Sequence, residues 1–329
     1  MEKIKCLALL SGGLDSILAA KMMLEQGLEM EGVVFMTPFS RCGPELIESF
    51  RAKLGIKIHV VELKQNYLKI VENPRHGYGS QVNPCIDCKI MMLRAAWRLA
   101  KRVGARFLVT GEVLGQRPLS QKKDKLSLIE RRAGLRGKIV RPLSGKLLPE
   151  TEAERMGWIK RGGMGDIQGR GRGKQLDMAK MFGVSEYKTP AGGCVLTDPC
   201  FARRIREYIK YNKRMTVQDA RWLLAGRHFR IGGSKVIVGK NEKDNMVIEK
   251  LWKSAKPKPA LLKVIDYIGP LTVVLNPEEK TLETAAEITA RYSDAPENES
   301  VLVSIKNGRD RHQIKVKPMS KVKVSGLII

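Results

Sequence analysis

The stretch "LALLSGGLDSILAAKMM", which begins at Leu7, constrains the fold more than any other part of the chain. Its apolar run stops at Ser11, Gly12 and Gly13, and a helical pattern follows directly. A strand, a glycine turn and a helix N-terminus in this order form an anion site, because free backbone N–H groups and the helix dipole point at the ligand. The stretch therefore predicts an α/β fold that binds a phosphate group at its first turn.

Strand-like and helix-like segments alternate along the first part of the chain. Alternation of this kind predicts a parallel sheet with helices on both faces. We expect strands at residues 5–10, 32–37, 56–62 and 106–110, and helices at residues 14–26, 44–54 and 85–103.

The second part of the chain has a different texture. Helical patterning covers residues 175–182, 201–213 and 217–224, and β-rich runs such as "KVIVGK" and "PLTVVL" follow from about Gly226. We predict an α/β domain at residues 1–213 and a smaller β-rich α+β domain at residues 214–329. The Gly- and Arg-rich stretch at about 155–174 is expected to be a loop or an insertion in the first domain.

Charge is the dominant compositional feature. The chain of 329 residues has 60 Lys and Arg against 34 Asp and Glu, a formal net charge of +26. This excess favours a polyanionic partner, above all a nucleic acid. An anionic membrane surface would require an amphipathic helix with aromatic anchors, and only 5% of the residues are aromatic. Basic runs at residues 122–138 and 161–174 are candidate phosphate contacts, with a solvated loop as the alternative.

The sequence predicts a cytoplasmic protein without membrane contact. No apolar stretch approaches the roughly 18 residues that cross a bilayer, and the N-terminus lacks a signal-peptide pattern. Six cysteines in 329 residues are too few for a disulfide scaffold.

The glycine turn is neither a Walker A loop nor a dinucleotide fingerprint, because no lysine follows the glycines and the spacing differs. It resembles the SGG-x-DS loop of the PP-loop ATP pyrophosphatases, which have the adenine nucleotide alpha hydrolase-like fold. The resemblance implies that this loop binds the pyrophosphate part of ATP through Ser11, Gly12, Gly13, Asp15 and Ser16. Asp15 either binds Mg²⁺ or stabilises the N-terminus of the helix.

A second group of polar residues follows the strand expected at residues 106–110. Ligands of open α/β sheets gather at the carboxyl ends of strands. We therefore expect Thr110, Gly111 and Gln116 to contact ATP or a target base, with Ser120 and Gln121 as weaker candidates.

The cysteines indicate sulfur or metal chemistry. "QVNPCIDCK" places Cys85 and Cys88 in a CxxC pattern at the start of a helix, where the dipole is expected to lower the thiol pKa. Cys194 lies in a glycine turn, and Cys200 follows it. Cys6, in the first strand, is expected to be a buried apolar residue, and Cys42 is a loop thiol without an assigned role.

This arrangement resembles the tRNA thiouridine synthases. The first catalytic cysteine of the 2-thiouridylases lies in NPD-x-x-CN, and here Cys88 takes its place while Cys85 replaces the aspartate. Cys194, in "GGCVL", resembles their second, persulfide-bearing cysteine. The run "TGEVLGQRPLSQ" is closer to the 4-thiouridine synthases.

The resemblance implies an ATP- and Mg²⁺-dependent tRNA uridine sulfurtransferase. Adenylation of a uridine carbonyl releases pyrophosphate, and sulfur then replaces the oxygen, with Cys88, Cys194 and Asp15 as catalytic residues. The sulfur donor is a protein or inorganic sulfide, and a homodimer is possible. The residues leave open whether position 2 or position 4 of the uridine is thiolated.

Three chemistries remain open for the cysteines. Cys85, Cys88 and Cys194 have the number of thiolates that a [4Fe-4S] cluster with one open iron requires, as in some tRNA thiolases. The alternatives are a persulfide route on Cys88 and Cys194 without a cluster, and a zinc site completed by Cys200 or simple core thiols.

The segment "GRHFRIGGSKVIVGKNEKDN" at residues 226–245 resembles the RNA-binding domain of NFACT-type proteins, with a small β-rich domain as the alternative. His228 and His312 are expected to be core or surface residues rather than ligands. Two other functions compete with tRNA thiolation. One is a different adenylating PP-loop enzyme, which forms an amide or modifies a small molecule, and the other is a non-catalytic RNA-binding protein.

Overall fold

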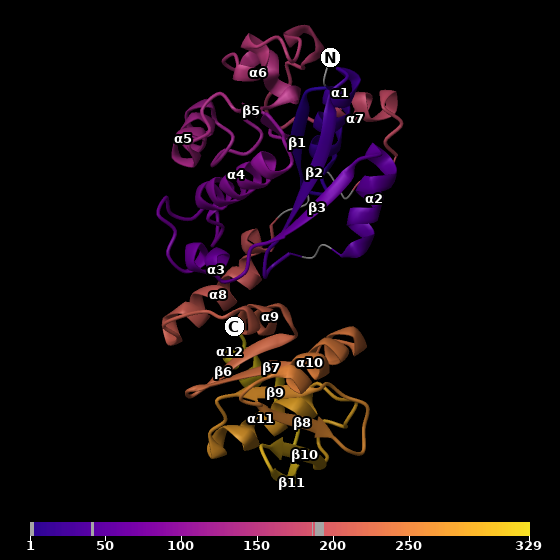
Figure 1. The fold of residues 1–329 in the computed structure, drawn as a ribbon. Helices are drawn as coiled ribbons and strands as arrows, with labels where there is room; N and C mark the ends of the chain where they lie inside the picture. The colour runs from indigo at the N-terminus through magenta and orange to yellow at the C-terminus, as the bar shows by residue number, and fades with distance from the viewer. Residues whose placement is uncertain (1–2, 41–42, 186, 188–193) are drawn as a thin grey trace. The chain divides into compact units, whose positions relative to one another are not determined.

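A computed structural model describes residues 3–40, 43–185, 187 and 194–329, and these form two compact units, Met1–Thr197 and Asp198–Ile329 (Figure 1). Each unit has its own sheet and its own hydrophobic core. No helix of the described residues is both long enough and apolar enough to cross a membrane.

The first unit is built on a parallel five-stranded sheet, as the alternation of segments predicted. Its strands follow the order β3-β2-β1-β4-β5, and every neighbouring pair is parallel. Their bounds are β1 Lys5–Leu10, β2 Glu29–Met36, β3 Lys57–Glu62, β4 Phe107–Thr110 and β5 Ile139–Val140. The chain moves from the β2–β3 side of β1 to the β4 side at the centre of the sheet, which is where ligands of such sheets bind.

Helices cover both faces of this sheet (Figure 1). Cys6 and Ala8 of β1 pack in one core with α1 and α2, whereas Leu7 packs on the other face with α4 and α5. Burial on both faces explains why β1 is continuously apolar rather than alternating. The helices of this unit are α1 Leu14–Glu25, α2 Pro44–Leu54, α3 Gln65–Glu72, α4 Cys85–Arg102, α5 Lys123–Ala133, α6 Glu152–Arg155 and α7 Gly173–Met181, with 3-10 turns at Pro142–Leu147, Arg161–Gly163 and Val195–Thr197.

The Gly- and Arg-rich stretch is part of the fold rather than a loose insertion. Ile159, Met164 and Ile167 are buried in the same core as β1, and the Trp158 ring stacks on Phe107 with 6.3 Å between ring centroids. Arg161 donates hydrogen bonds to the carbonyl oxygens of residues 146 and 148 and to the Glu154 carboxylate. The solvated-loop alternative is therefore wrong for these buried residues, whereas the stretch between α6 and α7 is mainly irregular backbone, as expected of a loop.

The second unit is α+β. Its six-stranded sheet has the order β11-β10-β8-β9-β7-β6, and all its pairs are antiparallel. Alternate residues face two cores, so Val236 packs towards α11 and Ile237 towards α9 and α10. The elements are α8 Pro199–Tyr211, α9 Val217–Leu224, β6 Arg227–Ile231, β7 Ser234–Val238, α10 Glu242–Ser254, β8 Ala260–Val264, β9 Thr272–Leu275, α11 Glu279–Arg291, β10 Val301–Asn307, β11 Asp310–Val316 and α12 Lys321–Leu327.

The division between the units falls before α8, earlier than the predicted boundary at residue 213. Arg204 of α8 donates to the Leu223 carbonyl of α9 at 3.1 Å, and Glu207 of α8 forms ion pairs with Arg230 and Lys235. These contacts join α8 to the second unit. Because they involve residues far along the chain, the helical pattern of α8 alone did not reveal them.

Candidate active site

The turn between β1 and α1 has the conformation of an anion-binding loop. Gly12 adopts φ +87, which favours glycine, and Gly13 begins α1 without a side-chain cap. The Ser16 hydroxyl donates to the Gly13 carbonyl at 2.8 Å, and the Ser11 amide donates to the Ser16 hydroxyl at 3.3 Å. The two serines thus hold the loop closed, with the positive end of α1 at its mouth.

The segment after β4 lies directly against this loop. A Cβ atom added to Gly111 would lie 2.5 Å from the Ser16 backbone nitrogen, so only glycine fits at this position. The Gln116 side chain donates to the Asp15 carboxylate at 3.1 Å. The structure therefore places Gly111 and Gln116 at the loop.

Asp15 also has a partner that the sequence analysis did not identify. Arg172, immediately before α7, donates to both Asp15 carboxylate oxygens at 3.3 Å across 157 residues of chain. Asp15, in the first turn of α1, thus has two side-chain partners in this structure. The Gly- and Arg-rich composition around Arg172 was the available signal, but spacing gave no indication of the partner.

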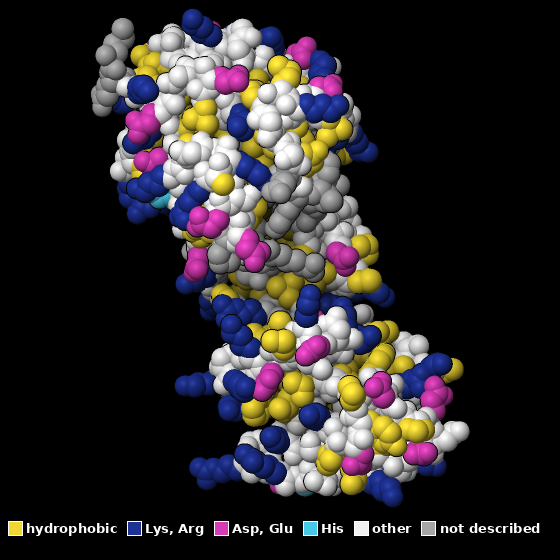
Figure 2. Space-filling view, turned by 90° about the vertical axis from the view of Figure 1, so that its right-hand side faces the viewer, with side chains coloured by type: hydrophobic (Ala, Val, Ile, Leu, Met, Phe, Trp, Pro, Cys, Tyr) yellow, Lys and Arg dark blue, Asp and Glu magenta, His cyan; other side chains and the backbone are white. Residues whose placement is uncertain are grey.

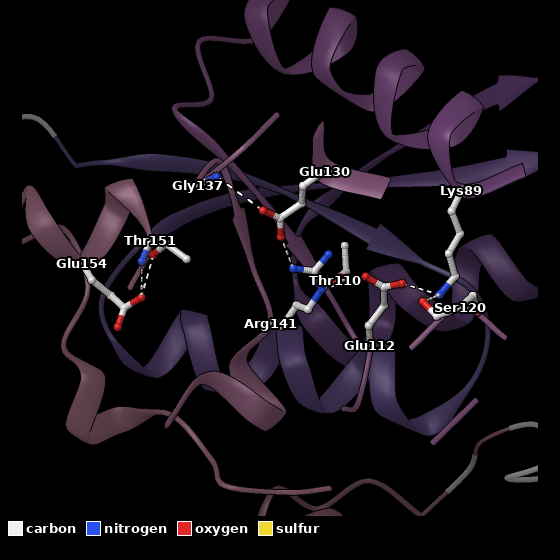
Figure 3. A network of polar contacts seen from close by, with 9 residues as sticks. All are labelled: Lys89, Thr110, Glu112, Ser120, Glu130, Gly137, Arg141, Thr151 and Glu154. Carbon is white, nitrogen blue, oxygen red and sulfur yellow. Dashed lines mark hydrogen bonds and ion pairs between the residues drawn. The ribbon is translucent and has the colours of Figure 1, made fainter. Parts of the chain in front are cut away.

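A network of buried charges lies beyond β4 (Figure 3). Arg141 donates from Nε to Glu112 at 2.8 Å and also pairs with Glu130, while Lys89 forms an ion pair with Glu112. Burial raises the pKa of Glu112, but Lys89 and Arg141 outweigh it and hold that pKa at about 2. Thr110 donates to Glu112 at 3.4 Å.

This network joins two parts of the candidate site. Lys89 directly follows Cys88, Glu112 directly follows Gly111, and Lys89 also donates to the Ser120 carbonyl at 3.5 Å. The side-chain oxygens of Ser120 and Gln121 are buried and have no hydrogen-bond partner among the described residues. Glu112 thus couples the helix that carries the thiols to the segment beside the phosphate loop.

The CxxC cysteines lie at the start of α4, as predicted. The Asn83 amide donates to Cys85 Sγ at 3.1 Å, and Cys85 is the first residue of the helix. The preceding loop is fixed to α4 because His76 Nδ1 and the Asp87 carboxylate are 2.8 Å apart. The Val82 amide donates to the Leu196 carbonyl at 3.2 Å, which holds the segment after Cys194 beside this loop.

Three thiols meet around the Tyr67 hydroxyl. Burial raises the pKa of the Tyr67 hydroxyl, on α3, and the neighbouring thiols of Cys88, Cys194 and Cys85 raise it further. Tyr67 was not identified from the sequence, because a buried tyrosine in an amphipathic helix looks like an ordinary core residue. Cys194 is exposed at this site, whereas Cys85 and Cys88 are half-buried.

Two thiols of this cluster have a raised pKa. Burial raises the pKa of Cys88 to about 12, with contributions from Cys194 and Cys85. Although Cys194 is exposed, the protein atoms around its thiol partly desolvate it and so raise its pKa, and Cys85 adds to that effect. The expectation that the helix N-terminus lowers the thiol pKa is therefore wrong for Cys88, because desolvation and neighbouring thiols dominate.

The cluster differs from a mononuclear metal site. Among the described residues, no three His, Cys, Asp or Glu side chains are placed to hold one metal ion. A zinc site would require such a compact group. Three thiols around one hydroxyl supply the donor chemistry of an iron–sulfur cluster, whose ligands bind different iron atoms and so need not converge on a point.

The remaining cysteines and histidines have other environments. Cys6 is fully buried, and burial raises its pKa to about 12, as expected for an apolar core position. Cys200 is exposed in the second unit, where Arg203 donates to it at 3.5 Å. His228 is buried, with Nε2 2.7 Å from the Ala225 carbonyl oxygen, and His312 lies at the surface beside Asp310. Cys42 lies outside the described residues.

The fold is an α/β unit with a glycine turn between its central strand and first helix, followed by a separate α+β unit. Residues 2–148 match the family described as Thiamine biosynthesis protein (ThiI), and residues 226–327 match the NFACT protein RNA binding domain. Both resemblances expected from the sequence are confirmed by these matches.

Similar proteins include tRNA-modifying enzymes. The "tRNA-specific 2-thiouridylase MnmA" of Sulfurimonas denitrificans is 33% identical over 33% of this chain and 35% of its own length. The "Probable tRNA sulfurtransferase" of Thermococcus kodakarensis is 32% identical over 43% of this chain and 37% of its own length. The chain thus spans about a third of the length of the curated relatives it matches.

Among solved structures, the "U34-tRNA thiolase NcsA from Methanococcus maripaludis with its [4Fe-4S] cluster" aligns with 63% of this chain and 65% of its own length. The identity is 17% and the TM-score 0.35, values too low to support an inference about function.

Proposed function

We propose that this chain uses ATP to thiolate a uridine in tRNA. The observation that carries the proposal is the meeting of Cys85, Cys88 and Cys194 around Tyr67, in the same unit as the Ser11–Ser16 loop. The matches to ThiI and to an RNA-binding domain, together with the net charge of +26, support tRNA as the substrate. An amide-forming enzyme would have no use for the three thiols.

The first step is adenylation. The uridine carbonyl oxygen attacks the α-phosphorus of ATP, and the bond from that phosphorus to pyrophosphate breaks. The amides of the Ser11–Ser16 loop stabilise the departing pyrophosphate at the positive end of α1. Asp15 would bind Mg²⁺, which neutralises phosphate charge. The uridine then has AMP as a good leaving group.

The second step replaces oxygen by sulfur. A sulfide attacks the activated carbon, and AMP leaves with the original oxygen, so one ATP and one sulfide give one thiouridine, one AMP and one pyrophosphate. A [4Fe-4S] cluster held by the three cysteines would supply an iron atom without a protein ligand, at which sulfide is held. Lys89, which follows Cys88, would favour negative charge at the thiols, because its charge opposes the rise that burial causes in the pKa of Cys88.

The persulfide route uses two of the same cysteines. The outer sulfur of a persulfide on Cys194 attacks the activated carbon, and AMP leaves with the oxygen. Cys88 then attacks Cys194 Sγ, which breaks the bond between the two persulfide sulfurs and releases thiouridine, with a Cys88–Cys194 disulfide left on the protein. An external thiol must reduce this disulfide before the next cycle. Tyr67, whose hydroxyl pKa both thiols raise, would keep the two cysteines together for either route.

Iron and sulfide analysis after anaerobic purification tests the cysteine assignment. We expect about four irons per chain in the wild type, and loss of iron in Cys85→Ser, Cys88→Ser and Cys194→Ser. Cys200→Ser is the matched control and should keep its iron. Absence of iron, with thiolation that survives Cys85→Ser but not Cys194→Ser, would establish the persulfide route.

Product analysis tests the reaction itself. With tRNA, ATP and sulfide, thiouridine and pyrophosphate should form in a ratio of about one to one. Pyrophosphate without thiouridine would indicate another adenylating enzyme. Tight tRNA binding with no pyrophosphate from the iron-loaded wild type would indicate a non-catalytic RNA-binding protein.

A further inference from the structure

Two glycines at the start of α7, Gly171 before the N-cap residue and Gly173 as the first helical residue, are not explained by the fold itself. Neither Gly171 nor Gly173 adopts a positive φ, and a Cβ added to either would meet no heavy atom within 4 Å. Gly111 is different, because a Cβ there would collide with the loop backbone. Glycine at 171 and 173 leaves the backbone open to close approach by a ligand.

The N-terminus of α7 has the features of an anion site. The helix has 9 residues, and its first residue follows Arg172, which provides no side-chain cap. The first turn therefore presents backbone N–H groups and the positive end of the helix dipole. Lys174 adds a second cation to the same turn, where it forms an ion pair with Asp166 at 2.8 Å.

A buried side chain at this turn lacks a partner. Gln175 is 0% exposed, and neither its Nε2 nor its Oε1 has a hydrogen-bond partner among the described residues. Because Cα–Cβ bonds in a helix tilt towards its N-terminus, this amide leans towards the first turn. Burial of an amide without hydrogen bonds destabilises the fold, and a bound ligand that supplies those hydrogen bonds would remove the cost.

The Arg172–Asp15 ion pair places this turn beside the phosphate loop. Both Asp15 oxygens lie 3.3 Å from Arg172 Nη1, and Asp15 is in the first turn of α1. Two helix N-termini are thus joined by one ion pair. A triphosphate held at the Ser11–Ser16 loop has enough anionic groups to contact the N-termini of both α1 and α7.

We propose that the first turn of α7 is a second phosphate-binding element, which binds the β- or γ-phosphate of the nucleotide held by the Ser11–Ser16 loop. The proposal rests on the proposed function. Arg172 pairs with Asp15 in the free protein and with a phosphate oxygen in the complex, which releases the Asp15 carboxylate to Mg²⁺. Gln175 hydrogen-bonds the bound phosphate through its Nε2.

Calorimetric titration with a non-hydrolysable α,β-methylene ATP and with AMP tests this assignment. Arg172→Ala should weaken binding of the ATP analogue about tenfold or more, which is the value of one charge-assisted hydrogen bond. Its affinity for AMP should be unchanged. Arg172→Lys should restore part of the affinity. Lys180→Ala, at the other end of α7, removes the same charge and should bind both ligands like the wild type.

Two further variants separate a binding role from a structural one. Gln175→Met keeps the volume and removes the unsatisfied amide, and Gly173→Ala favours the helix, so both should keep or raise the melting temperature. Both should nevertheless weaken the ATP analogue. A raised melting temperature with unchanged affinity would show that these residues serve only the fold.

The outcomes distinguish this inference from the proposed function. A wild type that binds neither nucleotide overturns both. If the wild type binds the ATP analogue and Arg172→Ala and Gln175→Met bind it with the same affinity, only the second phosphate element is overturned. Loss of tRNA affinity in Arg172→Ala with unchanged ATP-analogue affinity would also overturn it, because the turn would then bind RNA.

Discussion

Each unit buries a carboxylate between two cations, but the two sets are balanced differently. In the first unit Glu112 lies between Lys89 and Arg141, and Glu130 supplies a second negative charge to Arg141. In the second unit Glu207 alone serves Arg230 and Lys235. These sets make one network permanently charged and leave the other with an excess of positive charge.

The pKa values reflect this difference. Lys89 and Arg141 overcome burial and hold the pKa of Glu112 at about 2. Burial lowers the pKa of Lys235 to about 8, even though Glu207 opposes the shift. A buried charge without a partner destabilises the fold strongly. The balanced network around Glu112 is therefore structural, and the unbalanced network around Glu207 can respond to pH or to an anionic partner. On the face in Figure 2, Lys and Arg side chains lie at several places on both units, and the proposed RNA substrate would find contacts there for its phosphates.

The largest expected effect is that of Glu112→Gln. Removing this carboxylate leaves Lys89 and Arg141 buried with too little negative charge, and the first unit should lose about 3–5 kcal/mol of unfolding free energy. Hydrogen exchange of peptides from α4 and β4 measures the loss. Glu45→Gln, at an exposed position on α2, is the control. A loss below about 1 kcal/mol would mean that the network does not depend on its central carboxylate.

The fold of the first unit was largely predictable from the sequence, because its signals are local. Apolar runs and glycine turns predicted β1 at Lys5–Leu10 and α2 at Pro44–Leu54 with the bounds that the structure shows. The basic run at 122–138 was interpreted as a phosphate contact, but much of it is α5, whose Leu126 and Ile129 are buried. The helix was missed in the sequence because most of its residues are charged and its apolar face is narrow.

The candidate site was only partly predictable, because its partners are distant in sequence. Motifs indicated Ser11–Ser16, Cys88 and Cys194 one at a time. The contacts of Tyr67 with the thiols, and of Arg172 with Asp15, depend on which loops the strand order brings together. The pKa of Cys88 was predicted with the wrong sign, because a helix terminus can be read from sequence and burial cannot.

The second effect, by size, is the alkaline behaviour of Lys235. Its folded pKa of about 8 lies below the ordinary value of 10.5, so between these pH values the unfolded chain binds more protons than the folded one. The stability of the second unit should therefore rise from pH 8 to pH 10.5 by on the order of 3 kcal/mol, with the full penalty present below pH 8. Lys235→Met should remove this rise, measured as the difference between the two proteins in urea unfolding. If the unfolding free energies of the two proteins changed with pH in the same way, the lowered pKa of Lys235 would be contradicted.

Glu207→Gln should cost less than Glu112→Gln. Arg230 and Lys235 lose their shared carboxylate, but Lys235 can release its proton where Arg141 of the first unit cannot. We expect a loss of about 1–3 kcal/mol at pH 7, which shrinks as the pH rises above 8. Hydrogen exchange of β6 and β7 at two pH values measures it. A cost as large as that of Glu112→Gln, and independent of pH, would show that the two networks are equivalent.

The smallest effect concerns the ring beside the second network. The Arg230 guanidinium lies 4.4 Å from the centroid of the Tyr211 ring, which is 52% exposed. A cation–π contact at an exposed ring is worth about 0.5–1 kcal/mol, so Tyr211→Leu should cost no more than this in the wild type. In the Glu207→Gln background Arg230 has lost its ion pair, so the contact with the Tyr211 ring contributes a larger part of its remaining interactions. A double-mutant cycle of Glu207→Gln and Tyr211→Leu should therefore show a non-zero coupling energy, whereas strict additivity would mean that the ring and the carboxylate position Arg230 independently.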